Sequence, residues 1–234
     1  MNKHDTSLAK IETPNYKYYH KISLLFILCL IIANIGATKL VNIAGFILPG
    51  GIVVFPMLYV LNDILTEVYG FRASRKVIWL AMFSNLFTTL VLFGIVHLQP
   101  AEHWSNAEAY QGVFALTPRI FIASIVSYFI GELLNASTIS MLKIQLEGKY
   151  FAFRAILSTC VGALIETAIF GAIAFGNHLP LAAVVNIIFT LTAVKVLYEF
   201  LILPITVRVA AFLKREENLD VYEKPTLRAA FSIV

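Results

Sequence analysis

Long apolar runs separated by short polar stretches make up most of this chain. Each run has roughly the 20 residues that an α-helix needs to cross about 30 Å of hydrocarbon. Helices are required there because backbone amides left unpaired in lipid are strongly destabilising. The pattern therefore predicts an all-α integral membrane helical bundle with six transmembrane helices, expected at residues 22–39, 52–69, 77–97, 119–142, 153–175 and 181–213.

The composition leaves room for one membrane domain and excludes a second soluble one. Of the 234 residues, 59% are hydrophobic and 14% charged, which is too little charge for a soluble surface. We expect a cytoplasmic N-terminal arm at 1–21, a six-helix transmembrane domain at 22–213 and a cytoplasmic tail at 214–234. The last apolar run is too long for a straight crossing, so Pro204 is predicted to kink it or to mark its emergence into the interface.

The distribution of basic residues predicts the orientation. With six spans, all but three of the 18 Lys and Arg residues fall on one side or at its edge, the exceptions being Lys39, Arg119 and Lys195. Because cytoplasmic loops are rich in Lys and Arg, both the N- and C-termini are predicted to be cytoplasmic. Lys39, at the end of the first run, alternatively extends to the outer interface.

Three smaller features add little chemistry. Residues 49–51, Pro-Gly-Gly, predict a tight outer turn, with a broken or re-entrant segment lining a cavity as the alternative. Cys29 and Cys160 lie in apolar runs without metal-ligand spacing, so they are predicted to be small core residues. No phosphate-binding loop or nucleophile motif is present in the sequence, and we expect no cofactor, no metal and no enzymatic activity.

Charged residues inside the predicted spans are the strongest indication of function. Each is costly in hydrocarbon, so these side chains must face one another or a wet cavity. Five acids against two lysines leave an excess of negative charge, which suggests that some carboxyls are protonated or neutralised by cargo. The resulting hypothesis is that a proton or a cationic substrate takes part in transport. The seven residues are Lys39, Asp63, Glu67, Glu132, Glu166, Lys195 and Glu199.

Helical spacing assigns these charges to faces. Asp63 and Glu67 share a face with Tyr59, whereas Glu132 and Asn135 share one on another span. A carboxylate beside aromatic rings suits a flat, hydrogen-bonding and even cationic substrate. The alternative is that the aromatic residues are ordinary packing.

Two of these charge pairs also have simpler interpretations. Lys195 and Glu199 are four residues apart and could form an ion pair within one helix. Glu67 could instead pair with Arg72 and Arg75 at the cytoplasmic edge.

The pattern of the second run resembles the signature of the queuosine precursor transporter family. It reads Phe55-Pro56-x-x-Tyr59-x-x-x-Asp63-x-x-Thr66-Glu67-x-Tyr69-Gly70, followed by Arg72, Arg75 and Lys76. Supporting matches are Gly131-Glu132-Leu-Leu-Asn135, Gly162-x-x-x-Glu166-Thr167, and Lys195 with Pro204. The resemblance covers about residues 22 to 213.

This resemblance implies import of 7-cyano-7-deazaguanine and 7-aminomethyl-7-deazaguanine across the bacterial cytoplasmic (inner) membrane, for tRNA queuosine salvage. Secondary or facilitated transport is expected. The implied partners are a small deazapurine and the lipid bilayer, without nucleic acid, and with homodimerisation left open. Other interpretations are a substrate-capture subunit of an ATP-driven vitamin importer, a small channel and, least favoured, an intramembrane enzyme.

A guanine-like ring offers adjacent N–H donors that one carboxylate can accept in a bidentate manner. We therefore hypothesise that Glu132 and Glu166 bind the base, that Asn135 or Lys195 meets its O6, and that Asp63 neutralises Lys195 or a cargo amine. The full set of predicted substrate-binding residues is Tyr59, Asp63, Glu67, Glu132, Asn135, Glu166, Lys195 and Glu199.

Overall fold

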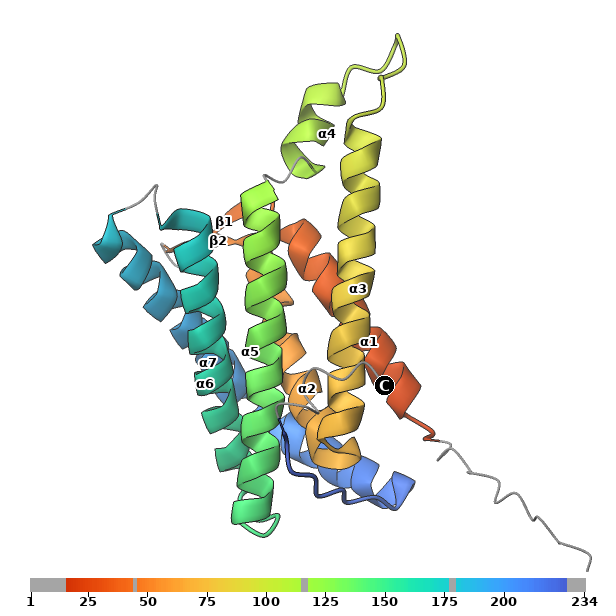
Figure 1. The fold of residues 1–234 in the computed structure, drawn as a ribbon, viewed down its shortest axis with the longest axis vertical. Helices are drawn as coiled ribbons and strands as arrows, with labels where there is room; N and C mark the ends of the chain where they lie inside the picture. Colours follow the sequence, from red (N-terminus) through yellow and green to blue (C-terminus); the bar gives the residue numbers. More distant parts are fainter. Residues whose placement is uncertain (1–15, 44–45, 115–117, 177–179, 227–234) are drawn as a thin grey trace, which may run out of the picture.

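Seven α-helices, a short hairpin and one 3-10 helix form the part of the chain that the computed structural model describes, residues 16–43, 46–114, 118–176 and 180–226 (Figure 1). The predicted N-terminal arm therefore lies largely outside the described residues. The elements are α1 (Tyr19–Gly36), β1 (Leu40–Ile43), β2 (Phe46–Pro49), η1 (Gly50–Val53), α2 (Pro56–Tyr69), α3 (Phe71–Val96), α4 (Ala107–Phe114), α5 (Pro118–Gln145), α6 (Phe151–Phe175) and α7 (Leu181–Glu217).

Five segments of the described chain are long and apolar enough to cross a membrane. They are α1, α3, α6, α7 and the segment 107–145, which contains α5. Large apolar side chains on these helices point outward, among them Phe87 on α3, Phe189 on α7 and Leu24 on α1, which are 71%, 63% and 58% exposed. So much exposed hydrophobic surface is what lipid contact requires. The protein is thus a multi-pass helical membrane bundle, as the sequence predicts.

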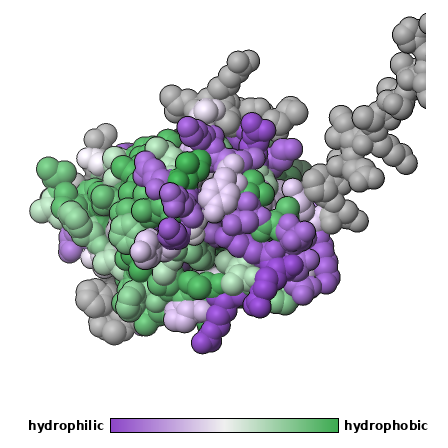
Figure 2. All heavy atoms as spheres, turned by 90° about the horizontal axis from the view of Figure 1, so that it is seen from below, coloured by the Kyte–Doolittle hydropathy of each residue, from purple (hydrophilic) through white to green (hydrophobic). Residues whose placement is uncertain are grey.

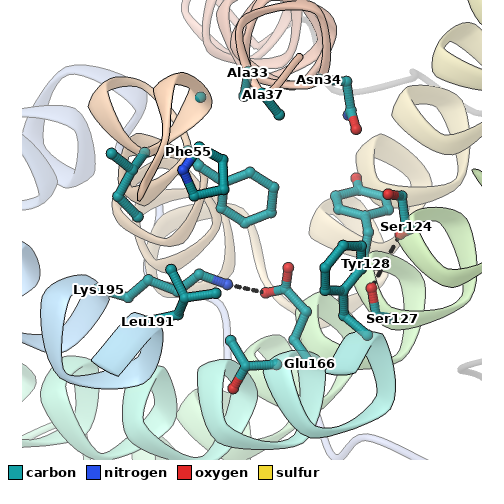
Figure 3. A pocket seen from close by; sticks show the side chains of 15 residues that line it. Ala33, Asn34, Ala37, Phe55, Ser124, Ser127, Tyr128, Glu166, Leu191 and Lys195 are labelled. Carbon is teal, nitrogen blue, oxygen red and sulfur yellow. Dashed lines mark hydrogen bonds and ion pairs between the residues drawn. The ribbon is translucent and has the colours of Figure 1, made fainter. Parts of the chain in front are cut away.

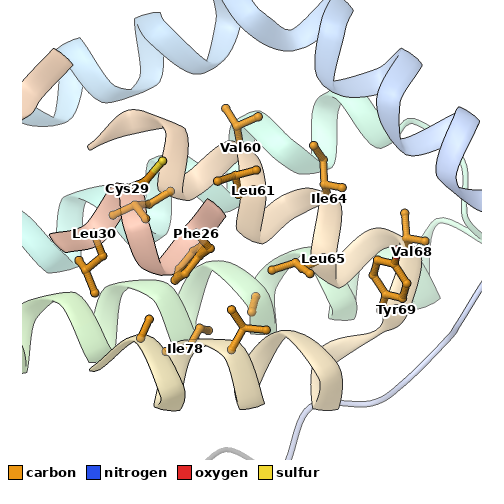
Figure 4. Close-up of a cluster of buried hydrophobic side chains, with 14 of the residues drawn as sticks. Phe26, Cys29, Leu30, Val60, Leu61, Ile64, Leu65, Val68, Tyr69 and Ile78 are labelled. Carbon is orange, nitrogen blue, oxygen red and sulfur yellow. The ribbon is translucent and has the colours of Figure 1, made fainter. Parts of the chain in front are cut away.

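The second predicted span differs from the expectation of one helix over 52–69. The helix α2 begins only at Pro56 and has 14 residues, which gives about 21 Å at 1.5 Å per residue, short of a full crossing. Every residue of α2 except Met57 is buried. It packs against α1, α3, α5 and α7, and Figure 4 shows its apolar residues within the hydrophobic cluster. The second run therefore forms the interior of the bundle.

The chain that precedes α2 is broken into short pieces. The strands β1 and β2 pair antiparallel, with Leu40 opposite Pro49, and η1 follows directly. A Cβ at Gly51 would lie 2.2 Å from the carbonyl oxygen of Ala33, so only glycine lets η1 approach α1 this closely. The predicted tight turn at 49–51 was wrong, and the alternative of a broken segment was the better interpretation. Lys39 lies outside α1 and is exposed.

A C-terminal segment crosses the end of the bundle opposite the hairpin. Gly70 joins α2 to α3 with φ +86°, and a Cβ there would lie 2.7 Å from the side chain of Val221. The hydroxyl of Ser140 on α5 donates to the carbonyl of Glu223 at 2.6 Å. The glutamate side chain in turn accepts the amide N–H of Arg72 at 2.8 Å. Residues 218–226, which we call the C-terminal strap, therefore pack over the α2–α3 turn. Pro204 lies inside the continuous helix α7.

Candidate functional site

A cavity of about 120 Å³ lies in the half of the bundle that carries the hairpin. Its wall comes from five elements far apart in sequence: α1, η1 with its flanking residues, α5, α6 and α7. The lining residues are Ala33, Asn34, Ala37, Pro49, Gly51, Ile52, Phe55, Ser124, Ser127, Tyr128, Glu166, Thr167, Phe170, Leu191 and Lys195. The broken chain before α2 thus supplies one side of the cavity.

An ion pair between α6 and α7 forms one side of this cavity (Figure 3). The Nζ of Lys195 lies 2.8 Å from Oε2 of Glu166, and both side chains are less than a tenth exposed. The same oxygen accepts the hydroxyl of Tyr59, which comes from the buried helix α2. Figure 3 shows the second carboxylate oxygen of Glu166 directed into the cavity. The cavity therefore offers one acceptor whose charge is already compensated by a lysine.

Aromatic rings stand on two sides of this acceptor. Phe55 and Tyr128 lie on opposite sides of the Glu166 carboxylate in Figure 3. The ammonium group of Lys195 lies 4.4 Å from the centroid of the Phe55 ring and 5.4 Å from that of Tyr59. Cations are attracted to the faces of such rings, so Phe55 and Tyr59 help to hold the lysine beside Glu166. The arrangement can receive a flat, polar molecule whose ring contacts aromatic walls while its edge donates to a carboxylate.

Two glycines bring α5 and α6 close enough to place Glu166. A Cβ at Gly162 would lie 2.9 Å from the carbonyl oxygen of Gly131, and one at Gly131 would lie 2.6 Å from Cβ of Glu166. Small residues at a helix crossing in membranes allow the two backbones to touch in this way. The motifs Gly131-Glu132 and Gly162-x-x-x-Glu166 therefore have a packing reason for their glycines.

Below the cavity, α2 is bound to α5 through two asparagines. Asn62 donates to the carboxylate of Glu132 at 2.6 Å and to its backbone carbonyl at 3.0 Å. Asn135 on α5 donates to Oδ1 of Asp63 at 2.7 Å. All four side chains are fully buried. These bonds satisfy part of the polar interior, and they fix the register of the short helix against α5.

Glu67 forms ion pairs with three cations at the end of α2. Arg154 on α6 donates to its two carboxylate oxygens at 2.5 and 3.1 Å. Lys214 on α7 donates to Oε1 at 2.5 Å, and Lys143 on α5 lies 3.9 Å from the same oxygen. A single buried carboxylate thus joins α2, α5, α6 and α7. We call Glu67, Lys143, Arg154, Lys214 and Asp220 the inner ion cluster.

The C-terminal strap completes this cluster. Asp220 pairs with Lys143 at 2.6 Å and with Lys214 at 2.8 Å. Loss of water raises the pKa of Asp220, but the hydrogen bonds from the two lysines lower it more, so the net pKa lies below its ordinary value. Lys143 also donates to the carbonyl of Val221 at 2.8 Å. Figure 2 views the molecule from below, the side on which the strap lies, and hydrophilic side chains gather there beside a hydrophobic flank. Helices and strap together close this end.

The structure brings the eight predicted residues together along one path, although not in one cavity. Glu166 and Lys195 line the cavity, and Tyr59 bonds to the first of them. The other five lie in the packed interior: Asp63, Glu67, Glu132, Asn135 and Glu199.

Three pairings that the sequence analysis had left open are not formed within the described residues. Lys195 bonds to Glu166, so the helical pair with Glu199 is not formed and Asp63 does not neutralise the lysine. Glu67 binds Arg154, Lys143 and Lys214 in place of Arg72 and Arg75. Residue spacing identifies possible partners on the same helix only. It therefore could not identify the partners that these side chains have on other helices.

Several site residues were not foreseen from the sequence. Asn62 directly precedes Asp63 on α2. A second polar residue at this point of an apolar run was the signal that the sequence offered. Arg154 and Lys143 were counted only as cytoplasmic charges for the orientation. Both are fully or almost fully buried, which no hydropathy pattern indicates.

The comparisons with known proteins agree with this architecture. A family model described as "Putative vitamin uptake transporter" matches residues 49–209, from the end of β2 to late α7. The chain belongs to this transporter family. Its relatives include a protein of Bacillus subtilis (strain 168) named "Probable queuosine precursor transporter", 27% identical over 173 residues, which are 74% of this chain and 76% of that one.

Two further members of the family carry the same kind of name. The "Queuosine precursor transporter" of Escherichia coli (strain K12) is 24% identical over 70% of this chain and 72% of its own length. The "Probable queuosine precursor transporter" of Haemophilus influenzae (strain ATCC 51907 / DSM 11121 / KW20 / Rd) is 30% identical over 53% and 51%. No solved structure matches the chain. As a family member the protein is a multi-pass membrane transporter and not an enzyme, whereas the alternative of a capture subunit finds no support.

Proposed function

We propose that this protein imports the queuosine precursors 7-cyano-7-deazaguanine and 7-aminomethyl-7-deazaguanine across the bacterial inner membrane for tRNA queuosine salvage. The observation that carries the proposal is the Glu166–Lys195 pair between aromatic rings in a cavity of a chain from this family. The mode is secondary or facilitated transport. A homodimer and the absence of nucleic-acid partners stay predictions.

The cavity matches the chemistry of a deazaguanine edge. The open oxygen of Glu166 accepts the N1–H or N2–H₂ group, and the ammonium group of Lys195 has further donors for O6. Phe55 and Tyr128 contact the faces of the ring. The aminomethyl form carries a cation, which the same carboxylate and the rings attract. Glu132 and Asn135 do not line the cavity, so the proposal assigns cargo contact to Glu166 and Lys195.

The position of the cavity also supports an orientation. It lies away from the inner ion cluster, whose end of the bundle carries most of the basic residues. By the positive-inside rule that end is cytoplasmic, with both termini on the same side. The structure then corresponds to an outward-facing arrangement in which ion pairs and the strap close the inner side.

The test uses a bacterial strain that makes no queuosine precursor and lacks its own importer. Expression of the wild-type chain with added 7-cyano-7-deazaguanine should restore queuosine in tRNA, measured by mass spectrometry of nucleosides. Glu166→Gln should reduce it to the level of the empty vector at equal membrane abundance. The matched control is Glu102→Gln, which removes an exposed acid and should keep the wild-type level. Unrestored tRNA with wild-type protein present in the membrane would contradict the proposal.

A further inference from the structure

Asp63 and Glu199 form a second group of buried carboxyls, apart from the cavity. Asp63 lies on α2 and Glu199 on α7, both side chains are 0% exposed, and neither lines the cavity. The two helices pack against each other, and the two carboxyls interact electrostatically across that interface. They are therefore neighbours in a part of the interior that water does not reach in this structure.

Most of the oxygens of this pair have no partner. Within the described residues, Oδ2 of Asp63 and both oxygens of Glu199 accept no hydrogen bond. Among the described residues, one hydrogen bond reaches the pair: the side-chain N–H of Asn135 donates to Oδ1 of Asp63. The side-chain carbonyl oxygen of Asn135 is also buried and accepts no hydrogen bond there. Buried polar atoms are nearly always satisfied, so these oxygens need a hydrogen-bond donor that the neighbouring side chains do not supply.

The surrounding charges do not compensate the pair. The other acids near Asp63 are Glu132 on α5 and Glu67 on α2. On α7, Lys195 is one turn from Glu199, but its ammonium group bonds to Glu166. The cations at the inner end, Lys143 of α5, Arg154 of α6 and Lys214 of α7, gather on Glu67. Tyr198 on α7 interacts electrostatically with Glu199 and with Cys29 of α1, and neither Tyr198 nor Cys29 supplies a positive charge. Two ionised carboxylates here would lack a counterion, a state that burial strongly disfavours.

We propose that Asp63 and Glu199 are the proton-binding site of the transporter, with one of the two buried carboxyls carrying a proton. This inference rests on the proposed function, and it names the proton as the ion whose movement is coupled to transport. Loading is a simple transfer: a carboxylate takes H⁺ from hydronium and leaves water, and release to the cytoplasm regenerates the carboxylate. No oxidant or reductant is needed.

The geometry also links this site to the cavity. Asp63 lies four residues after Tyr59 on α2, and Glu199 lies four residues after Lys195 on α7, so each pair shares a helix face. Tyr59 and Lys195 are the two side chains that bind Oε2 of Glu166. The same two helices therefore hold both the cargo acceptor and the proton site. Repulsion between unprotonated Asp63 and Glu199 acts on α2 and α7 together, and it alters how these helices hold Glu166.

The experiment uses purified full-length protein in liposomes that contain a pH-sensitive dye. One assay measures exchange of labelled 7-cyano-7-deazaguanine at equal concentrations inside and outside. A second measures accumulation under an outside-acid gradient with the membrane potential clamped at zero. For one proton per neutral cargo, one pH unit supports about tenfold accumulation. The wild-type protein should show both, and its lumen should acidify as cargo enters.

Asp63→Asn and Glu199→Gln should retain exchange but lose accumulation and cargo-dependent acidification. Glu108→Gln, which removes an exposed acid, should behave as wild type in all three measurements. Wild-type exchange without accumulation, accumulation driven by a sodium gradient alone, or accumulation by both variants would overturn the proton site while leaving the proposed function intact. Absence of wild-type exchange would overturn both. The wild-type acidification needs no variant, so proton coupling stays testable if one substitution prevents folding, and the second variant then tests the site.

Discussion

The Nζ of Lys195 on α7 lies 2.8 Å from Oε2 of Glu166 on α6, and Tyr59 of α2 donates to the same oxygen. Three helices therefore meet at one carboxylate on the edge of the cavity. A buried pair of this kind adds little net stability, but removal of one partner leaves an uncompensated charge. Its main consequence is that the position of Glu166 depends on α2 and α7 together.

Removing either member of this pair should cost stability, and removing both should not. Lys195→Gln leaves Glu166 uncompensated and should lower the free energy of unfolding by about 3–5 kcal/mol. Lys195→Gln with Glu166→Gln should recover most of that loss while cargo uptake stays absent. Thermal unfolding in detergent and uptake in liposomes measure the two effects. Lys149→Gln, at an exposed lysine, is the control. Uptake restored in the double variant would contradict a cargo role for the pair.

Removal of one cation from the inner ion cluster should destabilise the end of the bundle that the strap covers. Arg154→Ala removes both guanidinium bonds to the buried carboxylate of Glu67, and we expect a loss of about 3–5 kcal/mol. Arg208→Ala, at an exposed arginine of α7, should change stability little. Thermal unfolding of both variants in the same detergent measures this difference as a difference in melting temperature. Equal values for the two variants would mean that the cluster does not hold this end together.

The contact between α5 and α6 should tolerate no added methyl group. Gly162→Ala would place a Cβ 2.9 Å from the carbonyl oxygen of Gly131, so the helices must separate and carry Glu166 with them. We expect lower thermal stability and reduced uptake. Gly94→Ala is the matched control, because no atom lies within 4 Å of its added Cβ and alanine favours helix by about 0.5–1 kcal/mol. A Gly162→Ala protein as stable and active as Gly94→Ala would refute the close-contact explanation.

Asp220 should make the strap sensitive to acid. Its pKa lies below the ordinary 3.8, so the folded state binds this proton less readily than the unfolded state. The stability that it contributes is therefore present above pH 3.8 and is lost as pH falls through the folded value. Asp220→Asn should lower the melting temperature at neutral pH, and its difference from wild type should vanish well below pH 3.8. A difference of the same size at both pH values would show that the ionised form is not responsible.

The sequence predicts the helical membrane bundle and most of its spans because length and hydropathy depend on local residues alone. It does not predict that α2 is short and buried, since residues 52–69 have the same apolar character as a lipid-facing span. What distinguishes α2 is the set Tyr59, Asn62, Asp63 and Glu67, each bonded to another helix. Such contacts depend on how helices are arranged around α2, which one sequence does not contain.

The same dependence on helix arrangement explains which contacts of the site the sequence did not predict. Helical periodicity placed Tyr59, Asp63 and Glu67 on one face, and the structure keeps that order from the cavity to the inner end. Their partners on α5, α6 and α7 required three-dimensional packing. The sequence offered the cavity wall at residues 49–51 only as an alternative to a tight turn, because the close approach of Gly51 to α1 depends on the crossing of two segments.

Transport by the isolated protein tests the central claim most directly. Purified wild-type protein in liposomes should exchange labelled 7-cyano-7-deazaguanine, and unlabelled 7-aminomethyl-7-deazaguanine should compete whereas vitamins that lack a guanine-like edge should not. Glu166→Gln should reduce exchange to that of protein-free liposomes, and Glu102→Gln should leave it unchanged. Exchange that persists in Glu166→Gln, or that unrelated vitamins inhibit equally well, would contradict a deazaguanine site at the Glu166–Lys195 pair.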